Sequence, residues 1–386
     1  MRKLHILVLG LGILLLVLLL LKEKPEEIKQ PDSKDKPSVV EPKKADPFPI
    51  KKPTLDDALA LISKDDLKQN LEYLASDELE GRMSGKKGNK LAAEYVKKKF
   101  ESYGLPTEYH KFPIKRVNPG PRNEFGDDFT QNVYAWIEGN DPKYKDDIVV
   151  IGAHMDHIGY GPSMSRFGGN KIHYGADDNA SGTVALLEMA RAMSLLKDQV
   201  KRTVVFMAFS AEEMGLKGSL HYVNNPLFPR ANPSIAKHIF MLNMDMVGYL
   251  GQAQTASFED GSSSPDIGQI IKDLGNKYSF AKSITLRGSS GSDHAPFYNK
   301  KVPVAFLHTG LHSYYHTPKD TADKINFDGL VKVTKYGFEL AWTVSNSTNK
   351  PEFDYGSYRE MDYNHDHGQK DLPFPEKPLE EKNNEP

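Results

Sequence analysis

The chain has 386 residues, a formal net charge of −2 and no cysteine. The length allows one large domain or two ordinary ones, and the near-neutral charge lacks the basic excess of a nucleic-acid-binding domain. Without cysteine, disulfides, thiolate metal ligands and a cysteine nucleophile are excluded. Any metal site must therefore be built from His, Asp and Glu.

A leucine-rich segment begins the chain. Arg2 and Lys3 precede an apolar run that ends at Leu21, close to the lower limit of about 17 residues for crossing a bilayer. No small-residue cleavage site follows, so residues 1–21 favour a signal anchor over a cleaved signal peptide. Because basic flanks stay in the cytoplasm, the rest is expected to be exported. It would face outward from the membrane, in the periplasm or at the cell surface, or be secreted if the segment is cleaved.

Two polar segments flank the region expected to fold. Residues 22–50 are rich in Lys, Glu, Pro and Asp and are predicted to form a disordered linker. Residues 351–386 are predicted to be a largely extended or disordered tail. His365 and His367 lie in this tail, and their spacing beside acids is typical of solvated residues rather than of a metal site. One folded domain is expected over residues 51–350.

Helix and strand patterns alternate within this domain. Apolar residues at helical spacing predict helices, and continuous apolar runs predict strands that are covered on both faces. In chain order these are helices at 67–74 and 91–100, a strand at 148–151, a helix at 184–196, strands at 204–209, 239–242 and 302–307, and a closing helix at 327–344. The pattern favours an α/β fold, a three-layer sandwich with a mixed, mainly parallel central sheet flanked by helices. In such folds ligands bind beyond the carboxyl ends of the strands.

Histidines and acids follow the predicted strands at that edge. They are His154 and Asp156 after the first strand, Asp177 and Asp178 before the next helix, Glu212 and Glu213 after the second strand, Asp245 after the third, and His316 beyond the fourth. Taken alone, adjacent acids such as Glu212 and Glu213 usually mark a solvated strand end, and acids before a helix suit its N-terminus. Five segments that converge on one predicted edge instead indicate a metal or catalytic site.

The motifs at these positions resemble a known family. "GAHMDH" at 152–157, "GADDNASG" at 175–182, "FSAEEMGLKGS" at 209–219, "NMDMVG" at 243–248 and "YYHTPKDT" at 314–321 occur in the order found in co-catalytic zinc aminopeptidases. These are the enzymes related to bacterial leucyl aminopeptidase and aminopeptidase Y, in the superfamily of glutamate carboxypeptidase and glutaminyl cyclase. The resemblance covers about residues 65 to 348 and implies that residues 51–350 form a zinc peptidase domain.

The resemblance implies two Zn²⁺ ions per chain. The ligands would be His154, Asp178, Glu213, Asp245 and His316, with Asp178 bridging the two ions. His154 and Asp245 would complete one site, and Glu213 and His316 the other. Such a set suits zinc, since each ion receives one imidazole and carboxylate oxygens and keeps a position for water.

Further residues acquire roles by the same resemblance. Glu212 would be the general base that serves a hydroxide bridging the two metals. Asp156 would accept a hydrogen bond from the other nitrogen of His154, and Tyr315 would lie near the oxyanion. A cis peptide bond after Asp178 is compatible with the resemblance. His157 is assigned no role.

Two further residue pairs fall outside this ligand set. Asp177 and Asn179 would orient and cap the segment that carries the bridging acid, and Asp293 and His294 would hold a substrate loop.

The expected reaction is removal of N-terminal amino acids from peptides, with pocket walls at 288–299 and 308–315. Two related activities stay open: a glutaminyl cyclase with one zinc, and a carboxypeptidase for acidic dipeptides, for which Lys319 and Arg287 are the available basic residues. A non-catalytic receptor-like domain is the alternative from another class, but such domains usually lose ligands and here all five are present. The sequence leaves open the preferred residue and the oligomeric state.

Overall fold

The computed structural model describes residues 52–114, 128–161, 165, 171–251, 256–259, 263–280, 285–286, 291–356 and 358. The predicted anchor, the predicted linker and most of the predicted tail, with His365 and His367, lie outside these residues. Within this part of the chain, no helix is both long and apolar enough to cross a membrane. The folded unit described below begins at Lys52.

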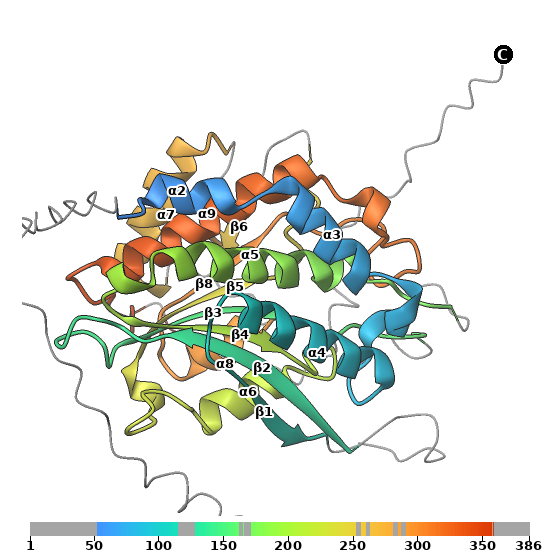
Figure 1. Cartoon of the computed structure of the whole chain (residues 1–386), viewed down its shortest axis with the longest axis horizontal. Coiled ribbons are helices and arrows are strands. Elements are labelled where there is room, and N and C mark those ends of the chain that lie inside the picture. The colour runs from blue at the N-terminus through green and yellow to red at the C-terminus, as the bar shows by residue number, and fades with distance from the viewer. Residues whose placement is uncertain are drawn as a thin grey trace, which may run out of the picture. The chain divides into compact units, whose positions relative to one another are not determined.

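One eight-stranded sheet forms the centre of this unit (Figure 1). The strands are β1 (Thr107–Pro113), β2 (Phe129–Ile137), β3 (Ile148–His154), β4 (Thr203–Phe209), β5 (His238–Met244), β6 (Ser257–Glu259), β7 (Thr285–Leu286) and β8 (Val304–His308). Their order across the sheet is β1-β2-β4-β3-β5-β8-β6-β7. The central neighbours β4, β3, β5 and β8 are all parallel, whereas β1, β2 and β6 pair antiparallel with their neighbours, apart from the parallel β6–β7 pair. The prediction of a mixed, mainly parallel sheet is confirmed.

Helices cover both faces of the sheet. The helices are α2 (Leu55–Leu61), α3 (Lys64–Leu74), α4 (Lys87–Ser102), α5 (Gly182–Leu195), α6 (Lys217–Asn224), α7 (Pro265–Lys277), α8 (His294–Asn299) and α9 (Phe327–Asn346). Side chains of α2–α5, α7 and α9 share one hydrophobic core, and those of α6 and α8 share a second. Figure 1 shows α5 and α9 on one side of the strands and α6 and α8 on the other.

Alternation along the strands supplies both cores. In β3, Val149 and Ile151 point into the first core, whereas Ile148 and Val150 point into the second, as the two-residue period of a strand requires. Every residue of β3, β4 and β5 is buried. This explains why these strands read as continuous apolar runs rather than alternating ones.

Local residue types explain where two of the helices begin or end. Ser63 caps α3 and accepts a hydrogen bond from the main chain of Asp66. Gly104, with φ of +73°, ends the turn that follows α4, a backbone conformation that glycine adopts without a steric penalty. Apolar patterns in the sequence did not predict β1, β2, β6, β7, α2, α6, α7 or α8. The strands β1, β2, β6 and β7 lie toward the two ends of the sheet, and β6 and β7 are only three and two residues long.

The buried His238 at the start of β5 predicts an acid-sensitive fold. Its Nε2 lies 2.8 Å from the Tyr222 hydroxyl and its Nδ1 lies 3.0 Å from the Ser234 carbonyl oxygen, and burial lowers its pKa from 6.5 to about 4. A histidine that folds neutral stabilises the protein fully above pH 6.5, and this contribution is lost as the pH falls toward 4. At about 1.4 kcal/mol per pKa unit, the loss is about 3 kcal/mol. Urea unfolding measures this for the wild type and His238→Gln between pH 7 and 4. The difference between their free energies of unfolding should shrink by this amount as the pH falls. A difference that stays constant with pH would contradict the lowered pKa of His238.

Candidate metal centre

The carboxyl ends of the parallel strands meet at one edge and bring the predicted site residues together. His154 is the last residue of β3, Asp245 directly follows β5, and Glu212 and Glu213 follow β4. Asp178 comes from the turn before α5. The sixth, His316, comes from the loop after β8. All six are buried.

Residues in the left-handed backbone conformation direct these side chains toward the site. Ala211, Met246 and His316 have φ between 54° and 58°, a region that residues other than glycine enter at a cost of about 1–2 kcal/mol. Ala211 precedes the two glutamates, so the chain leaves the straight path of β4 before it reaches them. The turn lets Glu212 and Glu213 both face the site, although neighbours in a straight strand would point to opposite faces.

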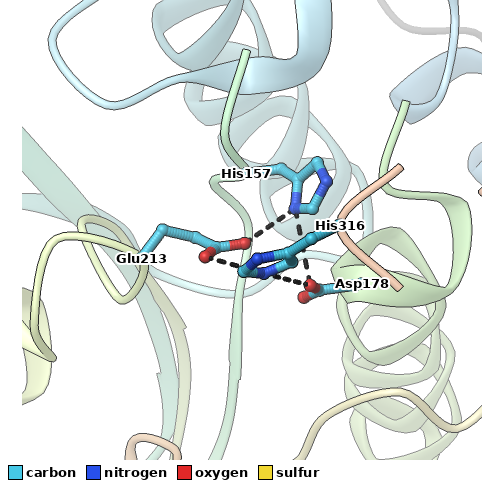
Figure 2. Close-up of side chains that lie close together, drawn as sticks. All are labelled: His157, Asp178, Glu213 and His316. Atoms are coloured by element: carbon cyan, nitrogen blue, oxygen red, sulfur yellow. Dashed lines mark hydrogen bonds and ion pairs between the residues drawn. The ribbon is translucent and has the colours of Figure 1, made fainter. Parts of the chain in front are cut away.

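Two groups of potential ligand atoms result, and Asp178 joins them. Its Oδ1 lies 3.4 Å from Nε2 of His154, which in turn lies 3.3 Å from Oδ1 of Asp245. Its Oδ2 lies 3.2 Å from Nε2 of His316, which lies 3.1 Å from Oε2 of Glu213. The carboxylate of Asp178 thus presents one oxygen to each group, which is the arrangement expected of a bridging ligand (Figure 2 shows the second group).

These residues fit two zinc ions. Ligand atoms of a tetrahedral zinc with bonds of about 2.0–2.1 Å lie about 3.3 Å from one another, and the four separations match that value. Within the described part of the chain, the buried His154 Nε2, His316 Nε2 and Asp245 Oδ1 make no hydrogen bond. Buried polar atoms normally have partners, so atoms that converge without them are suited to a cation. Each group has one imidazole and carboxylate oxygens, the donors that zinc accepts.

Glu212 stands with the first group. Its carboxylate lies within 4.8 Å of ligand atoms of His154 and Asp245. Burial raises its pKa well above the usual range, with further contributions from Glu213 and Asp245 against the opposing effect of His154. For Glu213 burial also opposes ionisation, but His316 and His157 outweigh it and lower the pKa well below the usual range. The pKa values of these two adjacent acids are therefore shifted in opposite directions.

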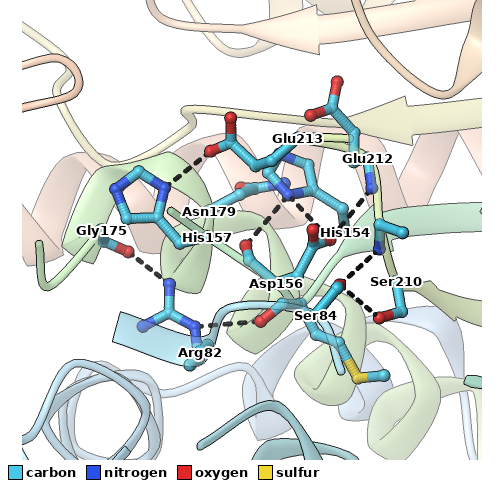
Figure 3. Close-up of polar contacts among 12 residues, drawn as sticks. Arg82, Ser84, His154, Asp156, His157, Gly175, Asn179, Ser210, Glu212 and Glu213 are labelled. Carbon is cyan, nitrogen blue, oxygen red and sulfur yellow. Dashed lines mark hydrogen bonds and ion pairs between the residues drawn. The ribbon is translucent and has the colours of Figure 1, made fainter. Parts of the chain in front are cut away.

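The contacts of Asp156 differ in detail from the expectation. Nδ1 of His154 lies 3.2 Å from the main-chain oxygen of Asp156 and 3.7 Å from its carboxylate Oδ1. The hydrogen bond in this structure therefore goes to the carbonyl. The same Oδ1 accepts a hydrogen bond from the main-chain N–H of Glu212 at 3.2 Å (Figure 3). Asp156 thus connects the loops that carry His154 and Glu212.

The segment around Asp178 is fixed by hydrogen bonds to the loops after β5 and β8 and to the end of β5. Asp320 accepts the N–H groups of Asp177 and Asp178 at 2.9 and 3.0 Å. Asp177 accepts from the N–H of Gly248 at 2.7 Å and contacts His312 at 2.9 Å. The side chain of the next residue, Asn179, donates to the Met244 carbonyl at 2.9 Å and accepts the Gly182 N–H at the start of α5. The peptide bond between Asp178 and Asn179 is cis.

Tyr315 and Asp293, also predicted from the sequence, lie close to the ligand groups. The ring of Tyr315 stacks on that of His316, with centroids 3.9 Å apart, and burial raises its pKa well above 10. Asp293 is fully buried at the start of α8, and burial raises its pKa to about 7. The neighbouring Ser292 donates a hydrogen bond of 2.8 Å to Oδ2 of Asp245.

Sequence reasoning missed several residues of this centre. They are His157, which lies in the second group, and the supporting residues Arg82, Ser292, His312 and Asp320. His157 was visible as the third residue after His154 in "GAHMDH" and Arg82 as part of "LEGRMSG". Single polar residues in loops carry no periodic signal, so only their positions in space reveal them.

Arg82 holds two of the loops that carry the site. Its guanidinium is completely buried and donates to the carbonyl oxygens of Leu74, Met155, Tyr174 and Gly175 at 2.6–2.9 Å (Figure 3 shows part of this network). Burial lowers its pKa to about 10, opposed by the nearby acids, so it stays charged at neutral pH. One cation thereby fixes the loop after β3 against the turn before Asp178.

The sequence and fold place the chain in a known group of hydrolases. The profile of Peptidase family M28 matches residues 132–341, and the chain belongs to this family. It is 31% identical over 301 residues to leupeptin-inactivating enzyme 1 of Streptomyces exfoliatus, across 73% of this chain and 61% of that protein. It is 28% identical over 252 residues to aminopeptidase YwaD of Bacillus subtilis, across 63% of this chain and 50% of that protein. The chain thus spans about half to three-fifths of these curated relatives.

Solved structures share the fold. A zinc aminopeptidase from Bacillus subtilis, BSAP, superposes with a TM-score of 0.58 and 17% identity, covering 80% of this chain and 100% of that one. Porphyromonas gingivalis glutaminyl cyclase superposes with a TM-score of 0.60 and 19% identity, covering 72% and 98%. At these identities the likeness establishes the fold alone.

Loss of Arg82 should destabilise the fold. Arg82→Met leaves buried carbonyl oxygens without donors, at about 1–3 kcal/mol for each unsatisfied group, so a total loss of about 3 kcal/mol or more is expected in urea unfolding. Arg230→Met is the control, because Arg230 is half-exposed in its ion pair with Glu108, and exposed pairs contribute about 0–1 kcal/mol. Equal stability of the two variants would show that the Arg82 network is dispensable.

Proposed function

We propose that this chain is a di-zinc exopeptidase that removes N-terminal amino acids from peptides. The observation that carries the proposal is the Asp178 carboxylate, which presents one oxygen to each of two buried histidine–carboxylate groups. Membership in Peptidase family M28 and the relatives named as aminopeptidases support the substrate class. His154, Asp178 and Asp245 would hold one zinc, and Asp178, Glu213 and His316 the other.

Zinc in this position would lower the pKa of water and polarise the peptide carbonyl. The protein's own contribution centres on Glu212. Its raised pKa suits a carboxylate that takes a proton from the attacking water and delivers it to the leaving amine. The bond from the Glu212 N–H to Asp156 holds this residue beside the first group. Tyr315, whose raised pKa keeps the phenol protonated, would donate a hydrogen bond to the developing oxyanion.

Glu212→Gln should separate catalysis from metal binding. The amide keeps the shape but cannot carry the proton, so kcat should fall by about 10²–10⁴ while zinc content stays at two per chain. Turnover and metal analysis on the same preparation check this. Glu339→Gln, on α9, is the control and should keep both values. Substantial activity in a fully metallated Glu212→Gln enzyme would remove the proposed role.

Glutaminyl cyclase is the second candidate, because a cyclase shares the fold with a TM-score of 0.60. Hydrolysis rates for free-amine, N-acetylated and N-glutaminyl peptides, with zinc counted, separate the candidates. The aminopeptidase should bind two zinc ions, cleave only free-amine peptides, lose activity with a chelator and regain it with zinc. Cyclisation of the glutaminyl peptide with one bound zinc would favour the cyclase. Cleavage of the acetylated set would overturn the exopeptidase.

We further propose that the protein is exported and held at the membrane by residues 1–21, on the basis of Arg2, Lys3 and the apolar run that follows. Replacing Leu15 and Leu16 by Arg should move the full-length protein out of the membrane fraction, since each central Arg costs about 2.5–3.5 kcal/mol on insertion. Fractionation followed by immunoblotting measures this. Wild type in the soluble fraction with an intact N-terminus would contradict the anchor.

A further inference from the structure

We infer that His157 is a positioning residue for the metal position formed by Glu213 and His316. Its Nδ1–H donates to Oε1 of Glu213 and keeps Oε2 turned toward the metal. The inference rests on the proposed zinc centre and concerns a residue to which the family resemblance gives no role.

The two carboxylate oxygens of Glu213 have different partners. Oε1 lies 2.7 Å from Nδ1 of His157, and Oε2 lies 3.1 Å from Nε2 of His316 (Figure 2). The side chain of His157 is buried. A carboxylate held at one oxygen cannot rotate freely, so the other oxygen keeps its direction.

The distances favour a hydrogen bond over coordination by His157. The 2.7 Å contact to Glu213 is shorter than the separation of about 3.3 Å between ligands of a tetrahedral zinc, and it is a normal length for a hydrogen bond to a carboxylate. The distance from Nδ1 to Oδ2 of Asp178, 3.6 Å, is longer than the other ligand separations. A further protein ligand would also take the coordination position that a catalytic zinc keeps for water.

The first metal position repeats this arrangement with other residues. Asp245 faces His154 with Oδ1, at 3.3 Å, and accepts the Ser292 hydroxyl at Oδ2, at 2.8 Å. Ser292 in turn accepts a hydrogen bond from Asn243 at 2.7 Å. Each non-bridging carboxylate therefore has one oxygen directed to the metal position and one fixed by a buried donor. Donors of this kind commonly tune metal affinity.

Packing fixes the imidazole of His157 in the donating orientation. A Cβ added to Gly175 would lie 2.6 Å from Cγ and Cδ2 of the ring, so only glycine leaves room for it. The carbonyl of Gly175 is held by Arg82 at 2.8 Å, and the ring meets His316 edge-on at 5.6 Å. Among the described residues, the other ring nitrogen, Nε2, has no hydrogen-bond partner. The contact with Glu213 therefore decides which nitrogen carries the proton.

Zinc titration of the metal-free protein against a chromophoric chelator tests the inference without an activity readout. The wild type should bind two ions. His157→Phe should weaken one of the two affinities by about 10–100-fold, the usual effect of losing such a donor, and leave the other unchanged. His157→Asn places an amide N–H near the position of Nδ1 and should recover most of the affinity. His110→Phe is the control, because His110 is buried in β1 outside both groups, and it should bind as the wild type does.

The outcomes separate the possible failures. Unchanged affinities in His157→Phe would overturn the role. If His157→Asn and His157→Phe lose zinc affinity equally, the role is also overturned. That result is expected if His157 is itself a metal ligand, because an amide donor cannot replace a ligand. If His157→Phe fails to fold in a thermal melt, His157→Asn is compared with His157→Gln, whose amide lies one bond further out and should bind weakly. A wild type that binds fewer than two ions would instead overturn the proposed metal centre itself.

Discussion

The burial of several carboxylates at one sheet edge is the constraint on which the rest of this structure depends. Asp156, Asp178, Glu212, Glu213 and Asp245 are all buried within the same region. Isolated buried charges are costly and are tolerated when they are paired, hydrogen-bonded or bound to a metal. In the proposed centre, two zinc ions carry a charge of +4 against −3 for the ligands Asp178, Glu213 and Asp245. The net positive charge would polarise a substrate carbonyl.

The surroundings of the centre serve to hold these acids in fixed directions. Asp320 fixes the main chain on either side of Asp177, Ser292 fixes Asp245, and Arg82 fixes the loop beyond β3. These hydrogen bonds join separate loops, and each restricts the movement of one loop relative to the other. Such outer contacts matter for a metal site because ligand direction sets both affinity and geometry.

The sheet determines why these loops meet at all. Parallel strands end on the same side, so β3, β4, β5 and β8 all deliver their following loops to one edge. The register pairs His154 with Phe209 and Gly152 with Asn243, which places the ends of three adjacent strands side by side. Helices pack on both faces of the sheet, and the site lies beyond the carboxyl ends of the parallel strands, where the loops that follow these strands meet.

The sequence by itself determined the central strands, the main helices and the convergence of the site residues. Ile148–Ile151 and Val204–Phe209 are continuous apolar runs because both faces of those strands are covered, and such runs are recognisable without coordinates. Each is followed by His or acidic residues, and the parallel fold then implies a shared edge. The motif resemblance added the pairing of each residue with a metal position.

Only the tertiary structure decided how the site is completed. The division of the Asp178 oxygens between two groups, the Ser292 bond to Asp245 and the contact of His157 with Glu213 depend on distances between loops far apart in the chain. Sequence spacing fixes the direction of a side chain relative to its neighbours in the same element. Distances across elements follow from strand register and from left-handed turns such as that at Ala211. Single polar residues in loops form no sequence pattern from which these distances can be predicted.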